Sequence, residues 1–176
     1  MYVRKRLLLP VLVAALVGSS LVFALGARAD RGDRESGSAD LLSSSLAPSL
    51  PAPTDPAIHG VAPGGAPWGL SAGSLRLRDD GRLDIRIDGL VLPTVGTGTT
   101  PGPVSAVAAS LFCGADSNTT PAATTATVPL SSDGDAVIRT TVVLPSTCLA
   151  PIVLIHPVIA STLNTSVYIA LTGWMH

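Results

Sequence analysis

Hydrophobic and polar residues alternate along residues 73–92, and this alternation predicts a β-hairpin. Leucine and isoleucine take every second position on both sides of an Asp-Asp-Gly sequence, and mostly arginine and aspartate fill the positions between them. A period of two is typical of strands that have one buried and one solvated face. The later part of the chain is therefore expected to pack against the apolar face of this hairpin.

The loop of the hairpin is predicted to be Asp79-Asp80-Gly81, because directly opposed residues share one face of a sheet. A two-residue loop would place Arg78 opposite Leu83, whereas a three-residue loop places Leu77 there. The three-residue loop also puts Gly81 at the left-handed third position of a type I turn with a bulge. The same register pairs Leu75 with Ile85 and Arg76 with Asp84.

Further strand-like segments recur up to the end of the chain, with Gly, Pro and Asp turns between them. We expect strands over residues 68–70, 74–78, 82–87, 104–113, 125–130, 136–144, 151–155 and 167–174, with residues 90–92 extending the third of them beyond a bend at Gly89. The Ala-rich residues 104–111 also fit two helical turns, so that alternative stays open. Seven or eight short strands favour an all-β fold, an antiparallel β-sandwich of the Ig-like or Greek-key type, over an open barrel.

Residues 1–29 have the pattern of a signal peptide. Arg4, Lys5 and Arg6 precede an apolar run over residues 7–25, and Ala27-Arg28-Ala29 forms a small-residue cleavage site before Asp30. An uncleaved anchor is the alternative, because the run approaches the length of a membrane span. The chain is expected to be secreted or extracellular, and membrane-associated only if this segment is retained.

Residues 30–66 are rich in Ser, Ala, Pro and Gly, and this composition predicts a disordered linker in which His59 is solvated. Residues 67–176 are long enough to form one β-sandwich domain with its own core. Arg31-Gly32-Asp33 matches an RGD tripeptide, which we interpret as a chance match in a solvated tail.

The charge balance limits the classes of partner. Cleavage before Asp30 would remove four of the eleven basic residues and none of the twelve acidic ones, leaving seven arginines and a net charge of −5. Such a charge argues against nucleic acid or an anionic membrane surface as a partner.

Cys113 and Cys148 are the only cysteines, and they predict a structural disulfide in an exported domain. Their separation does not match the C-x-x-C spacing of redox or zinc sites. The histidines His59, His156 and His176 are dispersed, so neither a metal site nor a cofactor is expected. His156 lies in an apolar run and is interpreted as a hydrogen-bonded structural residue.

Gly69-Leu70-Ser71-Ala72-Gly73 matches the G-x-S-x-G pattern of serine hydrolases. A nucleophile elbow requires this serine between a central strand and a helix, whereas here a linker precedes it and a hairpin follows. The aspartates Asp84 and Asp88 lie beside arginines on the outward face, which favours a solvated charge ladder over a glycosidase pair. Asp133-Gly134-Asp135 is interpreted as a β-turn. No catalytic residue is therefore assigned.

The stretch GSLRLRDDGRLDIRIDGL, together with the cysteine pair and the ending YIALTGW, resembles small secreted bacterial β-sandwich proteins. Its strand, Asp-Gly turn, strand and Gly-Leu rhythm is also similar to chordin-type domains, although the paired histidines of those domains are missing. The sequence thus predicts a secreted, non-catalytic extracellular or cell-envelope module of unknown ligand. A small secreted serine hydrolase using Ser71 and a membrane-tethered binding domain are the alternatives.

Overall fold

The computed structural model describes residues 38–94, 98–114 and 120–173. All regular secondary structure in these ranges is β-strand. The strands are β1 (Asp40–Pro48), β2 (Ala62–Pro63), β3 (Ala72–Arg78), β4 (Arg82–Asp88), β5 (Leu92–Thr94), β6 (Gly98–Thr100), β7 (Val104–Phe112), β8 (Ala123–Thr124), β9 (Val128–Pro129), β10 (Ala136–Thr141), β11 (Ile152–Ile159), β12 (Thr162–Leu163), β13 (Val167–Tyr168) and β14 (Ala170–Thr172).

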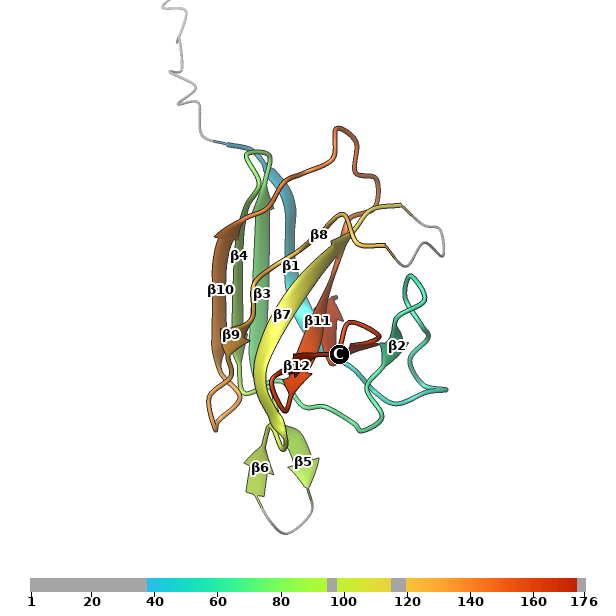
Figure 1. The fold of residues 1–176 in the computed structure, drawn as a ribbon, viewed down its shortest axis with the longest axis vertical. Helices are drawn as coiled ribbons and strands as arrows, with labels where there is room; N and C mark the ends of the chain where they lie inside the picture. Colours follow the sequence, from blue (N-terminus) through green and yellow to red (C-terminus); the bar gives the residue numbers. More distant parts are fainter. Residues whose placement is uncertain (1–37, 95–97, 115–119, 174–176) are drawn as a thin grey trace, which may run out of the picture. The chain divides into compact units, whose positions relative to one another are not determined.

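Ten strands form one antiparallel sheet in the order β10-β4-β3-β1-β14-β11-β7-β8, with β12 beside β11 and β9 beside β7. The sheet curls so that β10, β4 and β3 lie on one side and β11 and β7 on the other (Figure 1). The predicted all-β antiparallel class is confirmed. The two sides are joined by hydrogen bonds into one curled sheet, whereas the sequence predicted a sandwich of seven or eight strands.

Strand β1 makes the connection between the two sides. Residues 40–45 pair with β3, and residues 46–48 pair with β14. Leu46, where the partner changes, is completely buried. A strand that changes partners along its length turns a corner between sheet layers, so β1 explains why the sheet is continuous.

The predicted linker is wrong from Asp40 onward, because β1 lies in the middle of the sheet. Leu42 and Leu46 point toward the core, but the serines between and around them conceal the alternation in the sequence. Residues 49–66 are also held in place. The Tyr168 hydroxyl donates to the carbonyl oxygen of Pro56 at 2.7 Å, and β2 pairs with β13 in parallel.

The main core lies between the two sides of the sheet. The hairpin contributes leucines and isoleucines, and β7 and β11 contribute valine, alanine, leucine and isoleucine from the opposite side. These residues are Leu75, Leu77, Leu83, Ile85, Ile87, Val107, Ala109, Leu111, Val153 and Ile155. Each large apolar side chain buried here stabilises the fold by about 1.5–3 kcal/mol relative to exposure.

Strand β11 is buried on both faces. Ile155 belongs to the main core, while Leu154 packs with Val61, Phe112 and Tyr168 in a second cluster on the other face. The sequence predicted a strand over the apolar residues 151–155, and β11 lies between β14 and β7. Because β11 is apolar on both faces, both clusters are needed to bury it.

The predicted hairpin register is confirmed. Leu77 lies opposite Leu83, Leu75 opposite Ile85 and Arg76 opposite Asp84. Gly81 has a φ of +82° and donates its N–H to the carbonyl oxygen of Arg78 at 2.9 Å. The turn therefore has the left-handed residue that the parity of the flanking strands required.

Other strand predictions are met in part. Residues 104–112 form β7, so the helical alternative is wrong, because this segment pairs with β11 along its length. Residues 68–70 make only a single bridge, between Gly69 and Val91. Of the segment predicted over residues 125–130, only Val128–Pro129 form a strand, β9, and the described part of the segment predicted over residues 167–174 forms two short strands, β13 and β14.

The predicted disulfide between Cys113 and Cys148 is confirmed, with Cα atoms 4.9 Å apart. It ties the end of β7 to the segment that connects β10 and β11. Gly114 adds a backbone hydrogen bond to Leu149 at 2.6 Å beside it. The predicted signal peptide, with its cleavage residues Ala27, Ala29 and Asp30, lies outside the described residues. Within the described ranges, no helix has the length and apolarity needed to cross a membrane.

Candidate functional site

The arginines of the described chain gather on one surface of the sheet. Arg76 and Arg78 are on β3, Arg82 and Arg86 on β4, and Arg139 on β10. Alternation places all five on the side opposite the core, because leucine or isoleucine occupies each intervening position of the hairpin. We call this outward surface of β1, β3, β4 and β10 the arginine face.

Cross-strand pairing aligns its side chains in rows. Ser43 of β1 lies opposite Arg76 of β3, Arg76 lies opposite Asp84 of β4, and Asp84 lies opposite Arg139 of β10. Directly opposed residues have Cβ atoms about 4.5–5.5 Å apart. One row therefore holds two guanidinium groups with a carboxylate between them.

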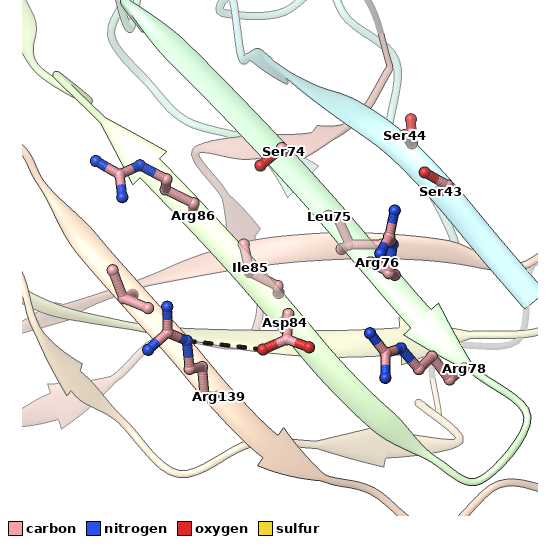
Figure 2. A pocket seen from close by; sticks show the side chains of 11 residues that line it. Ser43, Ser44, Ser74, Leu75, Arg76, Arg78, Asp84, Ile85, Arg86 and Arg139 are labelled. Atoms are coloured by element: carbon pink, nitrogen blue, oxygen red, sulfur yellow. Dashed lines mark ion pairs between the residues drawn. The ribbon is translucent and has the colours of Figure 1, made fainter. Parts of the chain in front are cut away.

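A groove of about 380 Å³ runs over this row. Its lining includes Ser43, Ser74, Arg76, Asp84, Arg86 and Arg139. Figure 2 shows the arginine side chains extending from three neighbouring strands around Asp84. The volume falls within the range of about 300–1,000 Å³ that small ligands occupy, so the groove is large enough for a ligand.

Exposed ion pairs link the arginines to neighbouring carboxylates. Nε of Arg139 lies 3.7 Å from Oδ1 of Asp84, and Nε of Arg86 lies 3.0 Å from Oδ2 of Asp88. Such exposed pairs contribute about 0–1 kcal/mol each. A guanidinium carries four further N–H donors on its terminal nitrogens. An incoming anion can therefore compete for these groups.

Asp40 from β1 adds a third carboxylate at the edge of the face. Its oxygens lie 3.3 Å from Nε of Arg76 and 3.9 Å from Nε of Arg78. The Asp88 carboxylate beside Arg86 raises the pKa of that guanidinium. At the hairpin end, the backbone N–H of Arg82 donates to Asp80 and lowers the pKa of that carboxyl.

The sequence indicated only part of this site. It predicted that Arg76 opposes Asp84, but it interpreted Asp84 and Asp88 beside the hairpin arginines as a solvated charge ladder. Asp40 and Ser43 were missed, because they lie in the segment predicted to be a linker. The only local signal was the weak alternation of Leu42 and Leu46 with small polar residues.

The surroundings of Ser71 differ from a nucleophile elbow. Ser71 is exposed and lies in the turn before β3, where its N–H donates to the carbonyl oxygen of Asp88 at 3.0 Å. The Ser71 hydroxyl lies against the backbone of Gly89, so closely that a Cβ atom on Gly89 would overlap the hydroxyl oxygen. A strand follows this serine, whereas the elbow requires a helix.

The two described histidines lie elsewhere. His156 on β11 is fully buried, and its Nδ1 lies 2.7 Å from the carbonyl oxygen of Val167. This confirms the predicted structural hydrogen bond. His59 is half-buried, and its ring stacks on Phe112 with centroids 4.9 Å apart, so the prediction of a solvated side chain is wrong.

Other candidate residues take simple structural roles. Asp133-Gly134-Asp135 forms a turn in which Gly134 donates to the carbonyl oxygen of Ser131 at 3.0 Å, as predicted. Among the described residues, no group of three His, Cys, Asp or Glu side chains is placed to hold a metal ion. His176, Trp174 and the Arg-Gly-Asp tripeptide lie outside the described ranges.

A second, apolar cavity of about 200 Å³ lies next to the disulfide. Leu41, Leu144, Cys148 and Pro151 are among the residues that line it. Its lining contains no charged side chain.

Comparison of the chain with protein-family models, with curated proteins and with solved structures finds no match to any of them. The resemblance to small secreted bacterial proteins and to chordin-type domains therefore stays a sequence-based prediction. The functional argument rests on the fold and on the arginine-lined groove.

Proposed function

We propose that this protein is an exported, non-catalytic module that binds an anionic ligand in the groove of its arginine face. In this proposal the module works in the extracellular space or at the cell envelope. The two sides of its curled sheet serve as the layers of a β-sandwich. The observation that carries the proposal is the placement of all five described arginines on one surface, where all of them except Arg82 line a groove of about 380 Å³.

Charge supports an anion over a neutral ligand. The described residues contain five arginines and eight aspartates, so this part of the chain carries a net charge of −3. A protein with a net negative charge is repelled by anions unless its cations are concentrated in one place. Concentrated arginines bind carboxylate or phosphate groups through paired hydrogen bonds.

Export is supported by the N-terminal sequence pattern and by the disulfide. Disulfides persist in oxidising compartments and are rare in the cytosol. The arginine-rich hairpin is rigid, because its apolar face is part of the main core. In this proposal the arginines are carried by rigid strands, and export exposes them to ligands outside the cytoplasm.

The proposal is tested with the exported protein on a negatively charged sulfopropyl resin at pH 7.5. Mass spectrometry should first show whether the mature chain begins at Asp30. Although the protein is acidic overall, we expect low-salt retention that is lost as salt screens the arginines. The variant Arg76→Glu/Arg139→Glu should flow through, whereas Arg82→Glu should be retained.

Two results would contradict the proposal. The first is flow-through of the wild-type protein at low salt, since it would show that the arginine face does not bind anions. The second is covalent labelling of Ser71 by a fluorophosphonate probe, which would indicate an activated serine and hence a hydrolase.

A further inference from the structure

We infer that the ligand of the arginine face is an acidic polysaccharide, bound along the row of side chains that crosses β1, β3, β4 and β10. This inference rests on the proposed function and names its ligand class. The geometry that supports it is a repeated arrangement of guanidinium groups, with hydroxyl and carboxylate groups between them, along the groove.

The spacing of the arginines suits a polymer with repeated negative charges. Arg76 and Arg78 are two residues apart on β3, a separation of about 7 Å along a strand. Arg139 lies two strands from Arg76, a separation of about 10 Å across the sheet. A ligand with a single charge could engage one of these positions, whereas a polymer can engage several at once.

The groove already accommodates a carboxylate. Asp84 lies between the strands that carry Arg76 and Arg139, and it forms an ion pair with Arg139 at 3.7 Å. A guanidinium and a carboxylate match each other as paired donors and acceptors. The carboxylates of an acidic sugar can therefore take the place that Asp84 now fills beside Arg139.

The remaining polar groups match the hydroxyls of a sugar. Ser43 and Ser74 line the groove, and a serine hydroxyl both donates and accepts hydrogen bonds. Asp84, once displaced from Arg139, accepts from a sugar hydroxyl. Arginines provide donors for the charged groups, so each kind of polar group on an acidic sugar finds a partner here.

Nucleic acid fits this surface less well. Single-stranded nucleic acid is bound by stacking its bases on aromatic rings. The described aromatic residues Trp68, Phe112 and Tyr168 are 7%, 2% and 1% exposed, and they contribute to the two apolar clusters. They give the groove no stacking surface.

An acidic peptide also fits less well. Extended peptides usually add to a sheet edge, where unpaired backbone groups form hydrogen bonds with them. The groove lies across β1, β3 and β4, which each have a paired strand on both sides, and it reaches β10, the edge strand. The floor over β1, β3 and β4 therefore offers side chains, and no backbone ladder for a peptide to extend.

The test measures binding of the exported protein to polygalacturonate by isothermal titration calorimetry, in low salt at pH 7.5. Fully methyl-esterified polygalacturonate is the matched ligand control, because it keeps the sugar chain and removes the charge. Poly-glutamate and a single-stranded oligonucleotide represent the other two ligand classes. Each variant is first checked for an unchanged circular dichroism spectrum.

We expect binding of polygalacturonate and little binding of its ester. The variant Arg76→Gln/Arg139→Gln should weaken the affinity at least tenfold. Arg82→Gln, which removes an arginine outside the groove lining, should change it less than twofold. Asp84→Asn should raise the affinity severalfold, because it removes the carboxylate that competes for Arg139. Damage to the fold would lower the affinity, so this last variant distinguishes competition from misfolding.

Other outcomes overturn the inference in different ways. Equal binding of the ester would show that charge is not recognised. Equal losses in the Arg82 and Arg76/Arg139 variants would place the ligand outside the groove. Arginine-dependent binding of poly-glutamate or the oligonucleotide alone would exclude a polysaccharide and leave the proposed function standing. Binding of no polyanion would overturn both.

Discussion

Buried His156 shows how a single residue in this protein depends on the structure around it. A carbonyl oxygen can only accept, so Nδ1 of His156 carries the proton that bonds to Val167. Nε2 is buried and has no hydrogen-bond partner in the described chain. Burial lowers the pKa of His156 below its usual 6.5, although the bond to Val167 partly offsets this effect. The folded protein therefore holds the neutral imidazole.

This residue predicts a loss of stability in mild acid. The unfolded chain takes up a proton near pH 6.5, while the folded chain resists it until a lower pH. The stabilisation is present above the unfolded pKa and is lost as pH falls below 6.5 toward the folded pKa. We expect the free energy of unfolding to fall by up to about 1.4 kcal/mol per pH unit in this window. Urea unfolding at a series of pH values measures it.

The variant that tests this is His156→Asn. Asparagine at position 156 retains a donor for Val167 but cannot be protonated, so its unfolding free energy should vary less between pH 7 and pH 5. A slope in His156→Asn as steep as in the wild type would show that other groups cause the acid sensitivity.

At the scale of elements, the hairpin and β1 differ in how their sequences encode them. Leu77, Leu83 and Gly81 are close in sequence, so their alternation and the turn identify the hairpin and its register. In β1, serines fill all three positions between Leu42 and Leu46, and a run of small polar residues is also typical of linkers. The strand forms because β3 and β14 both offer it hydrogen bonds, and neither is adjacent to it in sequence.

Strand β1 therefore predicts a large effect at Leu46. This side chain is completely buried where the strand changes partners, so Leu46→Ala should reduce the free energy of unfolding by about 2–5 kcal/mol. Leu41→Ala is the matched control on the same strand. Leu41 is 49% exposed, and its replacement should change stability by about 0.5 kcal/mol or less.

Thermal unfolding of both variants gives the comparison. If Leu46→Ala were as stable as Leu41→Ala, β1 would be a loosely attached segment, and the curled sheet would not depend on it. Amide hydrogen exchange in residues 42–48 provides a second measurement, because a central strand should be strongly protected.

At the scale of the whole molecule, the disulfide links two residues that are far apart in the sequence. Cys113 and Cys148 are 35 residues apart, and the segment between them contains β8, β9 and β10. A cross-link stabilises mainly by limiting the freedom of the unfolded chain. For a loop of this length the expected stabilisation is about 3–4 kcal/mol.

Cys113→Ser/Cys148→Ser tests this expectation in denaturant. Its free energy of unfolding should be lower than that of the oxidised protein by this amount, and reduction of the wild-type protein should give the same value. The variant should still bind the sulfopropyl resin under conditions where it is folded, because the arginine face does not include either cysteine. Unchanged stability in both the reduced protein and the variant would contradict a stabilising role for the bond.

The sequence by itself determined the local features of this protein: the strands with a clear period of two, the turn at Gly81, the outward position of the hairpin arginines and the pairing of two lone cysteines. The strands, the turn and the arginine positions depend on residues that are close in sequence. The cysteine pairing follows because each cysteine has only one possible partner. The tertiary structure decided that Asp40–Pro48 is a strand, that the two layers form one sheet, and that Asp40, Arg76, Asp84 and Arg139 share a surface. The groove depends on pairing between distant strands, and backbone hydrogen bonds leave little trace in the identities of the side chains.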